Sequence, residues 1–537
     1  MERINPNPAP APGSSPSPFA EWLRGWRYFF WFLAVLLLVT LWCAEENWRG
    51  SWAWKRRQQE MKERGEWQPA QDFIPPLVPD QDNFAMTPVL ASGVAARSLA
   101  GFKALASVQP LVEEYDVISR AARSNSIARL SSWAVPPAVD PAAWRTLLLK
   151  ATNQTVLPRD RLVATNFTGP EAAQALLSAL AGCAPIYDEL HAASRRPESR
   201  FNIFYQQDDP ASILLPHLAV VKQFSQLVLL RTVAELALGQ SNAAFVDLEL
   251  MLRLADATRT EPILVSQLVR MAQFQMAMPA ILQGINQWSA PQLRELQDSL
   301  ERIDFCADGA RVLRAERTFF GDRMLEFVRR TPDKVGLMRS FGGFGGSGPS
   351  GLEFAALLME VAPEGWFDLE HVKYNDMFQD YWLPTIDQTN HLFRPTATRR
   401  AEARLAAFQQ RSASGLYLRH QLFCGLMLPS VTNVVQKLAF AQTAADAASL
   451  ACALERYRRQ HGQFPEALSQ LVPDFMAGLP HDVISGQPLH YRRTPDGLYL
   501  LYSVGWNETD DGGHVALGRS GEVDRDSGDW VWRPASF

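Results

Sequence analysis

Histidine and cysteine carry the widest chemistry in this chain, because both can bind metals and both can act in catalysis. The nine histidines are His191, His217, His371, His391, His420, His461, His481, His490 and His514. The five cysteines are Cys43, Cys183, Cys306, Cys424 and Cys452. The sequence contains no HExxH, CxxC or GxSxG motif. These patterns predict neither a zinc site nor a disulfide framework, and we interpret the cysteines as small buried hydrophobic residues.

A glycine-rich segment at 341–351 (FGGFGGSGPSG) could let backbone amides approach a phosphate group. A phosphate-binding loop would follow an apolar strand and precede a Lys-Ser or Lys-Thr pair, and neither is present. We interpret the segment as a surface loop. The sequence assigns no catalytic or cofactor-binding residue, so the chain is predicted not to be an enzyme. A catalytic site assembled from distant residues stays open as an alternative.

The element that must position everything else is an uncharged apolar run from Tyr28 to Ala44. Seventeen helical residues span about 25 Å, and flanking tryptophans extend the run to the thickness of a bilayer. We predict a transmembrane helix over 26–46, after a disordered proline-rich tail over 1–25. The bulky Trp42 near the end of the run argues against a cleaved signal peptide. Basic residues lie on both sides, so charge alone does not fix the orientation.

Downstream of this run the sequence predicts a mainly α protein. Residues 47–92 form a charged helix and a proline-rich linker, and 93–428 form a large helical body in which apolar residues recur every three or four positions. The net charge of −5 lacks the basic face that a nucleic-acid partner requires.

The last segment, 429–537, has a different pattern. An alanine-rich helix runs to His461 and is stopped by Gly462. Two aromatic and β-branched runs follow, PLHYRR and LYLLYSV, joined by a turn at Pro495-Asp496-Gly497. This pattern predicts a small α+β module with a long helix and an antiparallel sheet.

Four runs of this module, ALERYRRQHGQFPEALSQLV, LPHDVISGQPLHY, LYSVGWNETDDGG and DSGDWVW, carry a resemblance. They resemble the soluble domain of the major pseudopilin (G-type) of type II secretion. A pseudopilin joins its membrane helix directly to the long helix and has a Gly cleavage site with a Glu five residues on. Here about 380 residues intervene and Gly25 is not followed by such a Glu. The chain therefore should not be processed and assembled as a pilus subunit. The remainder, with DFIPPLVPDQDNFAMTP and SQLVRMAQFQ, resembles large membrane-anchored bacterial proteins and implies no activity.

The resemblance also implies calcium as a cofactor, because the C-terminal loop of that family often binds it. Calcium takes six to eight oxygen ligands, which turn-rich acidic segments can supply. The residues that the resemblance proposes as ligands are Ser503, Asn507, Asp510, Asp511, Asp526 and Asp529. The alternative is a solvated acidic loop without an ion.

The function expected from these observations is a single-pass, membrane-anchored interaction or scaffold protein without catalysis, linked to the cell envelope or to a type II secretion-like system. Its partners would be the lipid bilayer through Tyr28–Ala44 and a protein of the envelope, with no nucleic acid. The resemblance places the N-terminus in the cytoplasm and the body outside the inner membrane. The alternative is an envelope enzyme with an active site hidden in the helical body.

Overall fold

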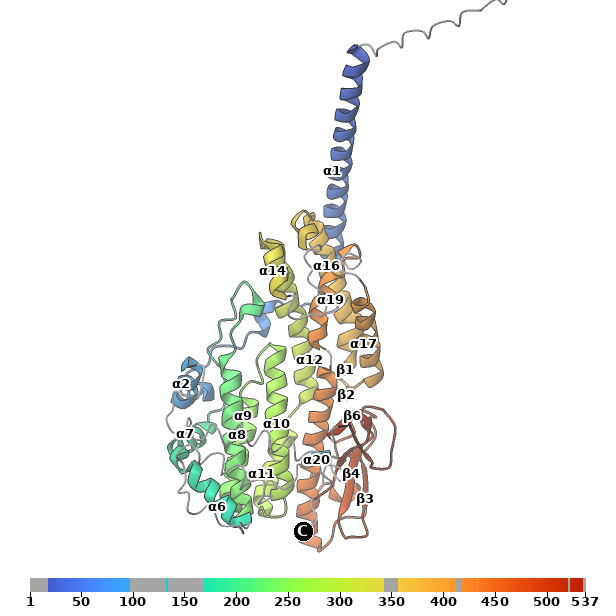
Figure 1. Ribbon diagram of the computed structural model, residues 1–537. Coiled ribbons are helices and arrows are strands. Elements are labelled where there is room, and N and C mark those ends of the chain that lie inside the picture. Colours follow the sequence, from blue (N-terminus) through green and yellow to red (C-terminus); the bar gives the residue numbers. More distant parts are fainter. Residues whose placement is uncertain are drawn as a thin grey trace, which may run out of the picture.

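The computed structural model describes residues 18–96, 132–133, 169–341, 356–411, 417–431, 433–519 and 522–534. The fold is mainly helical, with small antiparallel sheets near the C-terminus and a long apolar helix at the N-terminus, as the sequence predicts. Figure 1 shows the N-terminal helix projecting from one end of an elongated helical body, while the small sheets lie at the opposite end. The predicted glycine-rich loop lies outside the described residues, except for Phe341.

Helix α1 (Pro18–Glu63) is continuous through the apolar run and the charged segment after it. It begins at Pro18, within the stretch that we expected to belong to a disordered tail. Every described residue from Gly25 to Trp42 is exposed, and this part of the helix is long and apolar enough to cross a membrane. The second helix that passes the same test, residues 210–237, is mostly buried and belongs to the core of the body.

The linker after α1 contains two short 3-10 turns, Ala70–Phe73 and Phe84–Met86, and leads to α2 (Pro88–Ala96). The first group of body helices is α6 (Gly169–Leu180), α7 (Ala184–Ser194), α8 (Pro216–Ala237), α9 (Ser241–Asp256), α10 (Leu264–Gly284) and α11 (Ala290–Glu301). The second group is α12 (Phe305–Ala315), α13 (Arg323–Arg330), α14 (Lys334–Phe341), α16 (Glu364–Met377), α17 (Pro395–Gln409) and α19 (Leu422–Met427). A π-helical turn follows α12 (Glu316–Asp322), and another follows α16 (Phe378–Trp382).

Local sequence signals set several of these boundaries. Gly239 adopts a positive φ of 70° between α8 and α9, a conformation that glycine tolerates best. A capping box begins α11: the backbone N–H of Gln292 donates to the Ser289 hydroxyl, while the backbone N–H of Ser289 donates to the Gln292 side chain. The capping box satisfies backbone N–H groups at the start of α11, and Gly239 lets the chain change direction after α8.

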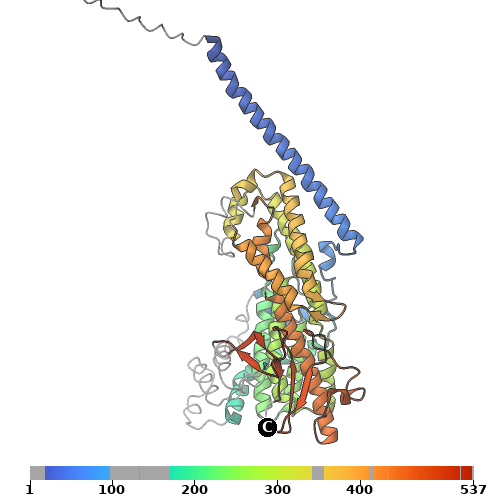
Figure 2. The same cartoon turned by 90° about the vertical axis from the view of Figure 1, so that its right-hand side faces the viewer.

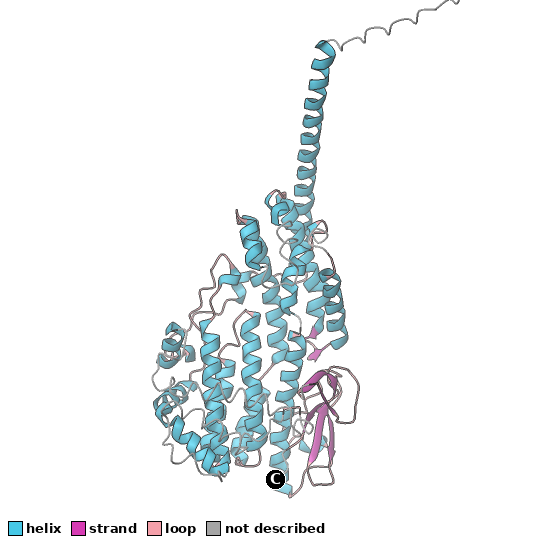
Figure 3. Ribbon diagram, in the orientation of Figure 1, coloured by secondary structure: helices cyan, strands magenta, loops and turns pink. Residues whose placement is uncertain are grey.

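The C-terminal segment contains α20 (Val434–His461), which Gly462 ends with a φ of 79°, as predicted. The predicted hairpin is present: β3 (His490–Arg493) pairs with β4 (Tyr499–Ser503), and Tyr491 lies opposite Leu501. Strand β7 (Trp530–Trp532) adds to β4 on its other side, giving the order β3-β4-β7. Strands β5 (Val515–Leu517) and β6 (Val523–Gly528) form a separate pair (Figure 3).

Helix α20 does not stand apart from the body. It packs against α10, α11 and α12, and its apolar residues belong to the same buried cluster as those of the body helices. Figures 1 and 2 both place α20 alongside the body helices, with the small sheets on its outer side. The expected boundary at residue 429 stays a prediction about sequence units, but the hydrophobic core continues across it.

Candidate functional site

The contact between α1 and α16 is the first functional feature, because it joins the apolar helix to the body. Gly50 and Gly365 let the two backbones touch. A Cβ atom at Gly50 would lie 2.1 Å from the Gly365 carbonyl oxygen, and one at Gly365 would lie 2.2 Å from the Glu46 carbonyl oxygen. The Asn47 side-chain oxygen accepts a hydrogen bond of 2.8 Å from the Gly365 backbone N–H. Asn47 of α1 thus supplies a hydrogen-bond acceptor for a backbone N–H in the first turn of α16.

Buried charges extend this contact. The Glu46 side chain has 3% of its surface exposed, its Oε1 lies 2.7 Å from His420 Nε2, and it also pairs with Arg49. Further along α1, Arg57 forms an ion pair of 3.1 Å with Asp376 of α16.

The end of α1 is also tied to the two π-helical turns. Arg317 donates a hydrogen bond of 2.7 Å to the Glu66 carbonyl oxygen, and Gln379 donates one of 3.0 Å to the Glu66 carboxylate. Arg317 and Gln379 lie in different π-helical turns, and they contact each other at 3.3 Å. Because buried polar groups need partners, these bonds fix the direction in which the chain leaves α1.

The residues proposed as calcium ligands fall into three places: an acidic loop, Asp526 and the buried Ser503. Asn507 donates to Asp511 Oδ2 (2.8 Å), and the carboxylate of Asp529 accepts the backbone N–H groups of Asp511 and Gly513. These residues form one acidic loop between β4 and β7. Asp526 instead accepts a hydrogen bond of 2.6 Å from Gln436 of α20.

The oxygens of this loop largely satisfy the loop itself. The Asn507 side-chain oxygen accepts from the Thr509 N–H, and Asp510 Oδ1 accepts from the Gly512 N–H. Ser503 is fully buried and donates to Asp482 Oδ1 at 2.7 Å. Burial raises the pKa of Asp529, and the hydrogen bonds that its carboxylate accepts from the Gly513 and Asp511 backbone N–H groups oppose this rise. The arrangement holds acidic side chains together, but it directs their oxygens at backbone amides, so calcium binding stays a prediction.

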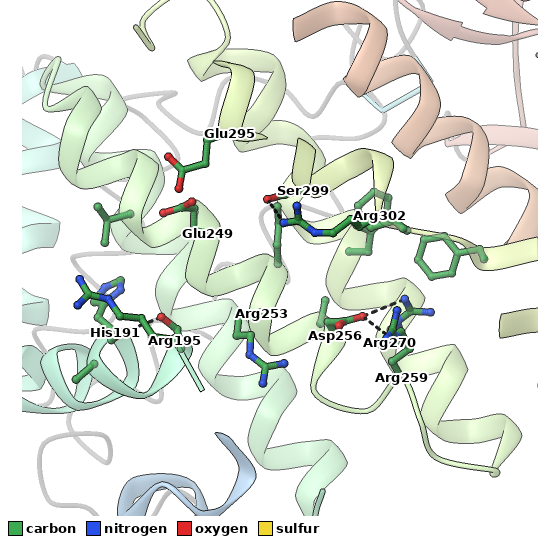
Figure 4. Close-up of a pocket in the computed structure, with 18 residues that line it drawn as sticks. His191, Arg195, Glu249, Arg253, Asp256, Arg259, Arg270, Glu295, Ser299 and Arg302 are labelled. Atoms are coloured by element: carbon green, nitrogen blue, oxygen red, sulfur yellow. Dashed lines mark hydrogen bonds and ion pairs between the residues drawn. The ribbon is translucent and has the colours of Figure 1, made fainter. Parts of the chain in front are cut away.

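The body contains a cleft of about 830 Å³ between α7, α9, α10, α11 and the start of α12 (Figure 4). Figure 4 shows the carboxyl groups of Glu249 and Glu295 next to each other in the lining. Burial, then a hydrogen bond with Glu295 and repulsion from its charge, raise the pKa of Glu249 to about 7. Glu249 can therefore take up or release a proton near neutral pH.

Arginines line the rest of the cleft. Arg270 is held by Asp308 (2.8 Å) and Asp256 (3.1 Å), and Arg302 donates to the Ser299 hydroxyl (2.9 Å). Arg195 is a further cation of the lining. Guanidinium groups bind carboxylates and phosphates well, so the chemistry of the cleft suits an anionic small molecule. No motif marks this cleft in the sequence, because its charged residues are common on helix surfaces and only packing brings them together.

One more group of donors lies outside the cleft. Within the described part of the chain, Asp304, Cys306 and His391 are the one group of three or more His, Cys, Asp or Glu side chains whose ligand atoms lie close enough to hold a metal ion. No spacing rule could find it, because His391 lies far along the chain from the other two.

Comparisons with protein-family models, with curated proteins and with solved structures found no match for this chain. The resemblance to a pseudopilin domain therefore stays an expectation based on sequence motifs.

Proposed function

We propose that the chain is a membrane-anchored interaction protein without catalysis, in which one transmembrane helix holds a large body at the membrane surface. The observation that carries the proposal is the continuity of α1 from its exposed apolar half into a half that is docked on α16. A flexible tether would have needed no glycine contact, buried ion pair or side-chain cap between anchor and body. The docking instead fixes the body relative to the helix.

The surface around this contact supports the proposal. Leu357, Val361 and Leu418 are 59%, 76% and 74% exposed, and they lie two to eight residues along the chain from Gly365 or His420, which both contact Glu46. Glu46 is two residues past the end of the apolar run. These apolar side chains therefore lie at the level where the chain would leave the bilayer. Exposed apolar groups suit a headgroup region better than bulk water.

The resemblance of the C-terminal module completes the proposal. The body would lie outside the cytoplasmic membrane, with the N-terminus inside, and would present the module at its far end to a protein of the envelope. Anchor and module lie at opposite ends of the molecule (Figure 1). The docking contacts would therefore point the module away from the membrane.

Two experiments test this function. Extraction of vesicles with alkaline carbonate should leave the full chain in the membrane, and release of the intact chain would contradict the anchor. Affinity purification from detergent-solubilised membranes should recover a protein partner that is lost when Arg492, the exposed residue of β3, is changed to Ala, with the exposed Arg294 of α11 as the matched control. Recovery of nothing above background would contradict the interaction role.

The cleft favours a second candidate function, binding or conversion of an anionic small molecule. The Glu249 carboxyl group, with a pKa of about 7, can exchange protons at neutral pH, and the adjacent arginines would hold the anion. The test is a thermal-shift screen of phosphorylated and carboxylated metabolites against the full chain, Glu249→Gln, and the exposed control Glu63→Gln. A compound that stabilises the full chain and the control, but not Glu249→Gln, would support this candidate. Its absence would argue against it.

A further inference from the structure

Three donor side chains converge beside the first turn of α12. They are the carboxylate of Asp304, the thiol of Cys306 and the imidazole of His391, and their ligand atoms all lie within 4.8 Å of one another. Asp304 immediately precedes α12, and Cys306 lies in its first turn. His391 comes from the turn between β1 (Ile386–Asp387) and β2 (Leu392–Phe393).

The individual contacts explain part of this arrangement. Asp304 Oδ1 caps α12 by accepting the Ala307 N–H at 2.7 Å, and it lies 3.0 Å from His391 Nε2. An ion pair and a cap would account for these two residues alone. The third donor is different: Cys306 has no exposed surface, and its sulfur has only a long contact of 3.9 Å with the Asp387 carbonyl oxygen.

The backbone of His391 is in an uncommon state. It adopts a φ of 53°, in the left-handed region that histidine enters more readily than most residues. Its carbonyl oxygen lies 3.2 Å from His481 Nε2, in the C-terminal segment. This conformation turns the imidazole towards Asp304 and costs backbone energy that a surrounding structure must offset.

We propose that Asp304, Cys306 and His391 bind a divalent transition-metal ion of the zinc class. Zinc takes thiolate, imidazole and carboxylate ligands at about 2.0 to 2.3 Å, which in a tetrahedron sets the ligand atoms about 3.3 to 3.8 Å apart. The three ligand atoms lie within 4.8 Å of one another, and Asp304 Oδ1 and His391 Nε2 lie 3.0 Å apart, so an ion would bind here after side-chain rotations that adjust these distances. Binding forms the three metal–ligand bonds, and the proton of the thiol leaves to solvent. A calcium or magnesium ion would not choose a thiolate ligand.

The neighbourhood supplies a fourth group. Asp446 of α20 interacts electrostatically with Cys306, Asp304 and His391, and its carboxylate accepts a hydrogen bond of 3.0 Å from Gln442. Its negative charge would favour a bound cation. The ion itself would connect α12 with the β1–β2 hairpin.

This position gives the ion a structural role at the junction of the body and the C-terminal segment. The Phe393 N–H donates 2.8 Å to the Val483 carbonyl oxygen, and His481 contacts the His391 carbonyl oxygen, so the hairpin already links both parts. A metal bound at the base of the hairpin would lock that link. The proposal does not depend on the proposed anchoring function.

Cobalt(II) tests the site directly, because it replaces zinc and reports its ligands by absorption. The full chain, purified in detergent and stripped with a chelator, should bind one Co²⁺ and develop a thiolate-to-cobalt charge-transfer band together with the visible bands of a tetrahedral ion. Excess Zn²⁺ should remove both. The band should be absent from Cys306→Ser and His391→Ala, and Asp446→Asn should weaken binding by about tenfold or more.

The control is Cys452→Ser, another fully buried cysteine, on α20. It should retain the band. Absence of the band in the stripped wild-type chain, or its survival in Cys306→Ser, would overturn the proposal. Because a variant can fail to fold, each is also melted with and without Zn²⁺. Zinc should raise the Tm of the wild type and of Cys452→Ser, and a wild-type Tm that zinc does not change would also contradict the site.

Discussion

At the scale of single residues, Glu370 of α16 gives the clearest prediction of pH dependence. It has no exposed surface, and its two carboxylate oxygens accept the backbone N–H groups of Leu422 (2.8 Å) and Phe423 (3.2 Å). Burial, opposed by these two bonds, raises its pKa to about 8. The unfolded chain ionises this group near pH 4.5, so its contribution to folding becomes less favourable as pH rises from about 4.5 to 8.

Replacing Glu370 with Gln removes this titration in both states. The Tm of Glu370→Gln should therefore fall less than that of the wild type between pH 5 and pH 8. At pH 5 the loss of one acceptor should make the variant less stable than the wild type by about 1 to 3 kcal/mol. Thermal melts across this pH range provide the measurement. The exposed control Glu63→Gln should follow the wild type. Identical slopes for Glu370→Gln and wild type would contradict the assignment.

The acidic loop shows how far residue types alone can reach. The sequence identifies Asn507, Asp510, Asp511 and Asp529 as oxygen donors on turns, and the structure brings them into one loop. The sequence could not predict that Asp526 would accept a hydrogen bond from Gln436, or that Asp482 would accept one from the Ser503 hydroxyl. Such pairings depend on how a helix and a sheet pack, which leaves no local signature.

At the scale of elements, the crossing of α1 and α16 depends on two glycines. In Gly50→Ala the new methyl group would meet the Gly365 carbonyl oxygen, so the helices must separate, at a cost of about 1 to 3 kcal/mol. The separation should also expose the segment after α1 to trypsin. Gly25→Ala is the matched control on the same helix, because no atom lies within 4 Å of its Cβ position. Equal trypsin resistance of the two variants would contradict the close contact.

Asn47 gives a second prediction at this crossing. Its side-chain oxygen accepts the N–H of Gly365 in the first turn of α16, so Asn47→Ala should leave that donor unpaired and cost about 0.5 to 2 kcal/mol. Asn47→Asp keeps an acceptor and should be close to wild type. Chemical denaturation of the three forms measures the difference. If Asn47→Ala and wild type unfold at the same denaturant concentration, the cap contributes nothing.

Elements with local signals were predicted well. Gly462 ends α20, and Pro495-Asp496-Gly497 turns the β3–β4 hairpin, because glycine conformation and turn chemistry act over a few residues. The segment PEALSQLV, residues 465–472, contains a 3-10 turn at Leu468–Leu471. The two π-helical turns had no signal, since Tyr374 packing against Gly321 is a contact between distant helices.

At the scale of the whole molecule, one core joins the body and the C-terminal segment. Helix α20 is buried along most of its length against α10, α11 and α12. A chain truncated after residue 428 would expose the apolar faces of these three helices. It should therefore aggregate or melt without a cooperative transition, whereas the full chain melts cooperatively. A soluble, cooperatively melting 1–428 fragment would show that the C-terminal segment is an independent domain.

The sequence predicted a helical body and an α+β segment, but not that they share a core. The narrow alanine-rich face of α20 indicated close packing with some element, and the sequence could not say which one. Its partners lie about 150 residues upstream, as the hydrogen bond of 2.7 Å from the Phe305 backbone N–H to the Gln442 side-chain oxygen illustrates. Such long-range pairing is decided by shape and by total buried area rather than by a motif.

The central claim is that the apolar half of α1 and the body form one rigid unit in a membrane. Spin labels at Leu36, in the apolar run, and at Leu418, an exposed residue of the body, test it by pulsed electron resonance in lipid vesicles, after Cys43 has been replaced by Ser. The account predicts a narrow distance distribution that matches the structure, and a broader one for Gly50→Ala. A broad distance distribution in the labelled chain that keeps Gly50 would mean that the body swings on a flexible tether, and would contradict the account.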